Sequence, residues 1–259
     1  MFYLNWFGFP ALVCSLAIIA IGFCVLLQNP RGPTHRALFY FCLSLFVWLF
    51  GYSAVYFSKD PEVALFWGRT SFLGIAFISS TNLYFNLTFI GVKNRKTLIG
   101  FAFATSLFYA LLSYTPYIYS GVKSFFWGYY TQIGALHPSF LIIFILIWSY
   151  SLYRLYKSMQ EKKKCQDFNA YNRTKSMFIA WTGGVVGMMD FLPNYGIGNY
   201  PFGCFVALYW TFTCAMALLN YSKPNLNLLT RKCLIGGYIA AGLMLLYICN
   251  CSLKHAFAF

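Results

Sequence analysis

The chain has 259 residues, of which 60% are apolar and only 9% are charged, and its mean hydropathy is +0.62. Ordinary soluble domains carry about 25% charged residues, and even a large one leaves about a quarter of its unfolded-chain surface in water. This composition therefore excludes a soluble enzyme, and it excludes a disordered chain, which needs low hydrophobicity.

Eight apolar segments are long enough to cross a bilayer, which takes about 20 residues in a helix. They predict an all-α fold, a polytopic membrane bundle of seven helices plus one. We expect a seven-helix domain over residues 1–221, followed by a basic loop and an additional helix over 222–259. The predicted helices cover residues 5–27, 37–57, 63–90, 98–118, 133–153, 176–193, 201–221 and 233–251.

The formal net charge of +14 comes from basic residues concentrated in alternate loops. Lys and Arg mark the cytoplasmic side of a membrane protein, so we expect both termini outside, the bilayer as the environment, and no nucleic-acid partner. The largest predicted cytoplasmic loop covers residues 154–175. Fifteen of the 19 basic residues lie on this side: Arg31, Arg36, Lys93, Arg95, Lys96, Arg154, Lys157, Lys162, Lys163, Lys164, Arg173, Lys175, Lys223, Arg231 and Lys232.

Two residues that carry a full charge at neutral pH fall inside predicted helices, Arg69 in the third and Asp190 in the sixth. Charged groups at such depth need a partner, and we expect these two to pair near the outer side. Glu62 is the alternative partner of Arg69, but it lies seven residues earlier, about 10 Å along the helix. The pair is either a structural clasp or a ligand-responsive contact at the mouth of an outward cavity.

Polar and aromatic residues near these positions allow two interpretations. Hydroxyl and amide side chains on the third helix tie helices together in lipid, or they line a cavity. Aromatic residues toward the outer side form an interfacial belt, or they wall a pocket. Gly183 and Gly187 have GxxxG spacing, which permits close helix packing. The candidates for pocket lining are Trp67, Ser80, Asn82, Asn86, Tyr195 and Tyr200.

Catalytic and metal-binding patterns are missing from the sequence. The three histidines are scattered, and most of the nine cysteines lie in apolar segments, where Cys behaves as a small hydrophobic residue. Phosphate-binding, nucleophile-elbow and zinc motifs do not occur. We therefore expect no catalytic residues, no metal and no cofactor.

Several strings, in this order and at these places, resemble the seven-helix N-terminal sensor region of bacterial histidine kinases. The resemblance covers residues 5–221. The strings are Asn29–Arg36, Trp48 with Gly51–Tyr52, Ser58–Arg69, Phe72–Gly74, Asp190–Ile197 and Tyr200–Pro201.

The resemblance implies a bacterial inner-membrane domain with an outside N-terminus and a sensory role, and it places Arg69 and Asp190 at family-like positions. Such proteins normally continue into a cytoplasmic output domain. Here a short basic loop, residues 220–232, leads to an eighth apolar segment, and no phosphoacceptor His-box or ATP-binding motif occurs. We expect that the chain cannot phosphorylate a substrate itself.

The sequence thus predicts a non-enzymatic membrane sensor or receptor-like module. A small or lipophilic ligand would shift helix packing near Arg69 and Asp190, and a separate cytoplasmic signalling protein would contact loop 154–175. Two alternatives stay open: a small-solute transporter or permease subunit, and a scaffold subunit of a membrane complex. The sequence does not specify the oligomeric state.

Overall fold

The computed structural model describes residues 2–219, and its first compact unit spans Met1–Ala217. This part of the chain is a helical bundle with one β-hairpin. Its elements in order are η1 (Trp6–Gly8), α1 (Phe9–Gln28), α2 (Pro33–Phe57), α3 (Pro61–Phe89), α4 (Lys96–Leu111), β1 (Tyr119–Phe125), β2 (Gly128–Ile133), α5 (His137–Lys164), α6 (Phe168–Thr182), α7 (Gly184–Gly187), η2 (Met188–Tyr195) and α8 (Gly203–Leu219).

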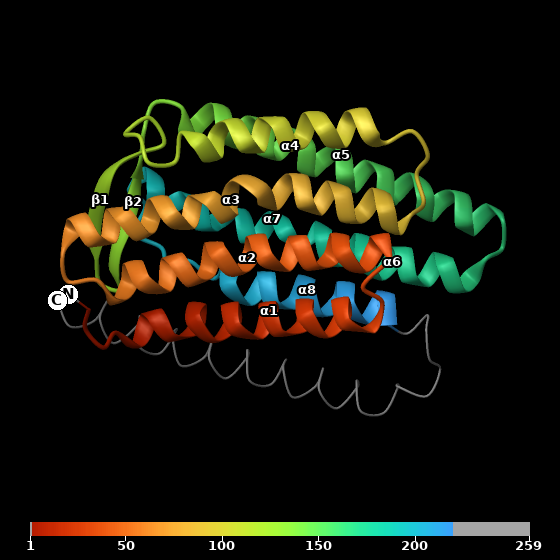
Figure 1. Ribbon diagram of the computed structural model, residues 1–259, viewed down its shortest axis with the longest axis horizontal. Helices are drawn as coiled ribbons and strands as arrows, with labels where there is room; N and C mark the ends of the chain where they lie inside the picture. Colours follow the sequence, from red (N-terminus) through yellow and green to blue (C-terminus); the bar gives the residue numbers. More distant parts are fainter. Residues whose placement is uncertain (1, 220–259) are drawn as a thin grey trace. The chain divides into compact units, whose positions relative to one another are not determined.

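The long helices lie side by side, with the β-hairpin at the end of the bundle where the described chain begins (Figure 1). The turn between α5 and α6 projects at the opposite end. Among the described residues, four helices are long and apolar enough to cross a membrane, and α4 and α8 are shorter apolar helices. The four are Trp6–Gln28, Pro33–Phe57, Pro61–Phe89 and His137–Lys164.

Proline and capping side chains set where the helices begin. Pro33 and Pro61 are the first residues of α2 and α3, a position where the missing N–H costs nothing. Asp60 precedes α3 and accepts a hydrogen bond from the Glu62 N–H at 2.8 Å. Asp167 caps α6 through the Ala170 N–H at 3.0 Å. These local signals divide the apolar sequence into separate helices.

Helices α2 and α3 approach each other closely because glycine lies at their contact. A Cβ atom at Gly74 would lie 2.4 Å from the Ser44 carbonyl oxygen and 2.5 Å from the Trp48 nitrogen. At Gly51, a Cβ atom would lie 2.5 Å from the Ser71 Cβ. Ser44 also hydrogen-bonds Thr81 across the two helices at 3.1 Å. This is the packing by small residues that membrane helices use.

The fourth helix ends at Leu111, so the predicted helix over 98–118 was wrong at its C-terminal end. Pro116 lacks an N–H and disfavours helical geometry in the residue before it. Strands β1 and β2 follow as an antiparallel pair, with Phe125 opposite Gly128 and a register irregularity between Tyr119 and Gly121. The sequence analysis did not predict this hairpin.

The sixth segment is broken, which corrects the prediction of one helix over 176–193. Helix α6 begins at Phe168 and ends at Thr182, and a short α7 and the 3₁₀ helix η2 continue the chain to Tyr195. Glycine weakens a helix interior by about 1 kcal/mol relative to Ala, and Gly183, Gly184 and Gly187 lie at the break. Pro193 lies within η2.

The predicted cytoplasmic loop 154–175 is instead a helical hairpin. Helix α5 continues to Lys164, only a short turn follows, and α6 starts at Phe168. Three lysines, Lys162–Lys164, form the last turn of α5, where cations interact favourably with the helix dipole. The predicted eighth helix at 233–251 and the predicted segment 222–259 lie outside the described residues.

We predict opposite effects for alanine at two glycines. Gly74→Ala should destabilise the protein by about 1–3 kcal/mol because its methyl group meets the backbone of α2. Gly100→Ala is the matched control, since Gly100 lies in α4 with nothing within 4 Å of its Cβ position, and alanine there should be neutral or stabilising. Thermal unfolding in detergent checks both variants. Equal melting temperatures for the two would contradict the close α2–α3 contact.

A candidate ligand-binding cavity

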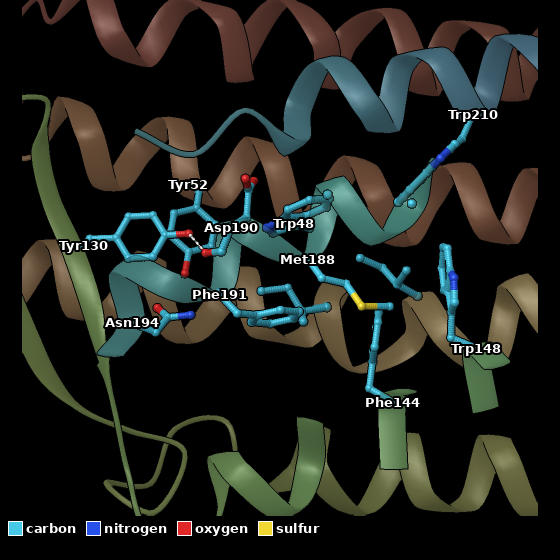
Figure 2. A pocket seen from close by; sticks show the side chains of 14 residues that line it. Trp48, Tyr52, Tyr130, Phe144, Trp148, Met188, Asp190, Phe191, Asn194 and Trp210 are labelled. Carbon is cyan, nitrogen blue, oxygen red and sulfur yellow. Dashed lines mark hydrogen bonds between the residues drawn. The ribbon is translucent and has the colours of Figure 1, made fainter. Parts of the chain in front are cut away.

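A cavity lies inside the bundle, close to the β-hairpin, and its wall is largely aromatic. Figure 2 shows the lining side chains, which come from α2, α3, β2, α5, α7, η2 and α8. Most of the described chain therefore contributes to one site. The lining residues are Trp48, Tyr52, Ile75, Ile78, Tyr130, Phe144, Trp148, Gly184, Gly187, Met188, Asp190, Phe191, Asn194 and Trp210.

The cavity is small in this structure. Its volume is about 30 Å³. That room suffices for a water or a very small molecule. A larger occupant has to displace wall side chains, and Met188 is the most flexible of them.

Glycine lets two tryptophans form one wall. A Cβ atom at Gly184 would lie 2.6 Å from Trp148 Cζ2 and 2.7 Å from Trp210 Cζ2. The Trp210 Nε1 donates to the Ala180 carbonyl at 3.0 Å, whereas the buried Trp148 Nε1 has no hydrogen-bond partner among the described residues. Buried indole N–H groups usually have one.

Asp190 lines this cavity and also a second, smaller one, to which Tyr56, Tyr200 and Cys204 contribute. The Asp190 carboxylate is buried and accepts from the Gly203 N–H, at 2.8 Å to Oδ1 and 2.9 Å to Oδ2. Gly203 begins α8, whose N-terminus favours negative charge. A Cβ atom there would lie 2.1 Å from Oδ2, so the contact requires glycine.

The β-hairpin closes one end of the cavity through hydrogen bonds. The Tyr130 hydroxyl donates to the Asp190 carbonyl at 2.7 Å, the contact drawn in Figure 2. Burial raises the pKa of the Tyr130 phenol well above its usual value, which keeps it protonated as a donor. Thr131 donates to the Asn194 Oδ1 and contacts the Tyr52 hydroxyl, each at 2.8 Å. The hairpin thus connects α2 to η2.

The structure does not join Arg69 to Asp190. The Arg69 Nη2 donates to the Tyr119 carbonyl at 3.0 Å, and its Nε has no hydrogen-bond partner among the described residues. Asp190 is held by Gly203 instead. Glu62 is exposed near the start of α3. The expected ion pair is therefore wrong for this structure, because Arg69 donates to a strand carbonyl and Asp190 accepts from the N–H at the start of α8.

The polar residues on α3 contact neighbouring helices rather than the cavity. The Ser106 hydroxyl donates to the Ser80 oxygen at 2.9 Å, and the Asn86 amide donates to Asn82 at 2.5 Å and to Ser151 at 2.8 Å. These contacts join α3 to α4 and α5. Of the two interpretations left open by the sequence, the geometry fits helix packing.

The three predicted aromatic residues are dispersed. Trp67 packs edge-on against Phe50, with ring centroids 6.1 Å apart. Tyr195 is 43% exposed, with its hydroxyl 3.4 Å from the His137 Nδ1. Tyr200 lines the smaller cavity beside Asp190. Only Asp190 of the predicted site residues lines the larger cavity.

Sequence reasoning missed most of the cavity wall, although α5 carries a usable signal. Phe140, Phe144, Trp148, Ser151 and Leu155 recur at helical spacing and are all buried. Such a stripe marks the inward face of a helix. The stripe does not reveal the open space beside Trp148. That space exists because Gly184, from a distant segment, has no side chain to fill it.

The described residues contain no group of three His, Cys, Asp or Glu side chains that could hold a metal. The cysteines within this part of the chain are free, and Cys165 and Cys24 are the exposed ones. The C-x-C pair at Cys249 and Cys251 lies outside the described residues.

We predict that Thr131→Val destabilises the protein by about 2–4 kcal/mol. The change leaves the Tyr52 hydroxyl and the Asn194 oxygen without this partner, and each unsatisfied buried group costs about 1–3 kcal/mol. Adding Tyr52→Phe should recover part of the loss. Thermal unfolding of the single and double variants measures the coupling. If the losses of Thr131→Val and Tyr52→Phe are simply additive, the hydrogen-bonded chain does not contribute as described.

A family model described as the N-terminal 7TM region of histidine kinase matches residues 10–222. No curated protein matches the chain. The match covers the described bundle, including α2, the broken sixth segment and α8. Together with the long apolar helices, it identifies an integral membrane protein of a sensor type. The chain belongs to the family of N-terminal seven-transmembrane regions of histidine kinases.

Proposed function

We propose that this chain is a non-enzymatic membrane sensor whose ligand occupies the aromatic cavity. The proposal rests on the observation that many elements line this cavity. Its lining residues come from α2, α3, α5 and α8, and also from the hairpin and the broken sixth segment. A molecule bound there contacts most of the bundle at once. Its presence can therefore alter how these elements pack.

The small size of the cavity supports coupling between binding and packing. Because the cavity has a volume of only about 30 Å³, a ligand of several heavy atoms can enter only if Trp48, Met188 or their neighbours move. Such a ligand binds an expanded arrangement better than the compact one. Unequal affinity for two states is what shifts a conformational equilibrium.

We propose further that the bundle lies in a bacterial cytoplasmic membrane as seven crossings plus an eighth, with both termini outside. The charge pattern supports this orientation. The β-hairpin, with Lys123 as its only Lys or Arg, then faces outward, and the lysine-rich end of α5 faces the cytoplasm.

Output in this proposal passes to a separate cytoplasmic signalling protein that contacts the α5–α6 hairpin. Lys157, Lys163, Lys164 and Lys175 are exposed there, and they favour a partner with an acidic surface. Helix α5 carries both Phe144 and Trp148 of the cavity wall and this basic end. A displacement of the wall can thus move the contact surface.

We predict that filling the cavity loosens the β-hairpin. Ile78→Phe adds volume to the wall, and the crowding should reach Tyr52 and Tyr130, so that amide exchange in residues 119–133 increases several-fold. Hydrogen–deuterium exchange of the purified protein measures this. Ile142→Phe is the control, because Ile142 is 61% exposed on α5 and lies outside the wall. Unchanged hairpin exchange in Ile78→Phe would argue against the sensor proposal.

We predict that Cys165 is labelled only from the cytoplasmic side. It is exposed in the turn between α5 and α6. In a chain that keeps only this cysteine, an impermeant maleimide should react in inverted vesicles and not in intact cells. Ser124→Cys in a cysteine-free chain is the opposite control, because Ser124 is exposed on β1. Labelling of Cys165 in intact cells would overturn the orientation.

A further inference from the structure

Asp190 is the one acidic residue of the described chain that is not exposed. Asp60, Glu62, Glu161 and Asp167 are all exposed, whereas Asp190 is only 8% exposed. Its carboxylate contacts backbone N–H groups at the start of α8, and no Lys, Arg or His side chain of residues 2–219 is among its partners. A buried carboxylate is costly unless a positive charge or further donors compensate it.

Aromatic side chains surround the space next to this carboxylate. Trp48, Tyr52 and Tyr130 line both cavities, as Asp190 does, and Trp48 lies beside Asp190 in Figure 2. The Tyr52 and Tyr130 rings stack with centroids 4.7 Å apart. The faces of Trp and Tyr rings attract cations, most strongly where water is excluded.

Resting on the proposed sensor function, we propose that the ligand is a small organic cation, such as a quaternary ammonium compound. Its charge lies at the Asp190 end of the cavity, against the rings of Trp48, Tyr52 and Tyr130. Its methyl groups contact the apolar wall. The Asp190 carboxylate would repel an anion, and a neutral molecule would bring no positive charge to balance it.

The opposite end of the cavity offers one unused donor. Trp148 is 2% exposed and its Nε1 has no hydrogen-bond partner within residues 2–219, and the edge of the ring next to Nε1 lies against Gly184. A hydroxyl or ether oxygen on the ligand can accept this hydrogen bond. The site therefore favours a cation that carries an oxygen a few atoms from its charge.

Choline and its neutral carbon analogue, the alcohol in which carbon replaces the nitrogen, test the charge directly. The two have the same shape and the same hydroxyl group. Binding to the full chain in phosphatidylglycerol nanodiscs is measured by calorimetry. We expect choline to bind at least about ten-fold more tightly than the alcohol, since a desolvated cation–aromatic contact is worth about 2 kcal/mol and 1.4 kcal/mol is ten-fold.

Asp190→Asn removes the charge while it keeps an oxygen for the Gly203 N–H. It should reduce choline affinity about ten-fold or more and leave alcohol affinity within about two-fold, so the preference is lost. Asp60→Asn is the matched control, because Asp60 also accepts from a backbone N–H but is exposed at the start of α3. It should change neither affinity. If Asp190→Asn fails to fold, the comparison of choline with the neutral alcohol on the wild-type chain still tests the inference.

The outcomes separate this inference from the sensor proposal. Equal affinity for the two probes, no binding of either, or an unaltered preference in Asp190→Asn overturns the cationic ligand. If the alcohol binds as tightly as choline and still increases amide exchange in the hairpin, the sensor proposal stands and the cationic ligand is wrong. If choline binds through Asp190 but hairpin exchange never changes, the ligand inference stands and the sensor proposal fails. Competition from phosphatidylcholine added to the nanodiscs would assign the cation to a lipid headgroup rather than to free choline.

Discussion

The break in the sixth segment is the constraint on which the rest of this bundle depends. Backbone groups that leave a helix inside a packed bundle need partners within the protein, because an unpaired buried polar group is costly. Here the Asp190 carbonyl receives the Tyr130 hydroxyl, and the Pro193 carbonyl receives the Gln132 amide at 3.2 Å. The donors come from β2 in both cases. The hairpin and the broken segment therefore depend on each other.

The same break produces the cavity. A regular helix through residues 176–193 would carry its side chains past α5 and α8 as a continuous ridge, and the space between them would be filled. Instead Gly184 and Gly187 present no side chain to Trp148 and Trp210, and the chain narrows into η2. Large rings on the neighbouring helices then face one another across a glycine surface, with Asp190 at one end.

The long apolar segments could be predicted from the sequence, because length and hydropathy are properties of a segment by itself. The hairpin could not, since its strands alternate poorly and are held by contacts such as Arg69 to the Tyr119 carbonyl. Arg69 and Asp190 stand out in the sequence as charges within apolar segments. In the structure their hydrogen-bond partners are backbone groups. Every residue has these groups, so such partners cannot be recognised from the sequence, which suggested an ion pair that the structure does not form.

Helix α5 connects the wall of the cavity to the lysine-rich turn at its own C-terminal end. Its buried stripe begins at His137 beside the hairpin and passes Phe144 and Trp148 in the cavity wall, and the helix continues without interruption to Lys164. Helix α5 is unbroken over this length, whereas the sixth segment is interrupted at Gly183 and Gly184. In the proposed sensor, a ligand that displaced both would alter how α5 and α6 pack, and with it the basic surface at their turn. The same cavity is therefore bounded by a continuous helix, α5, and by a broken segment, α7 with η2.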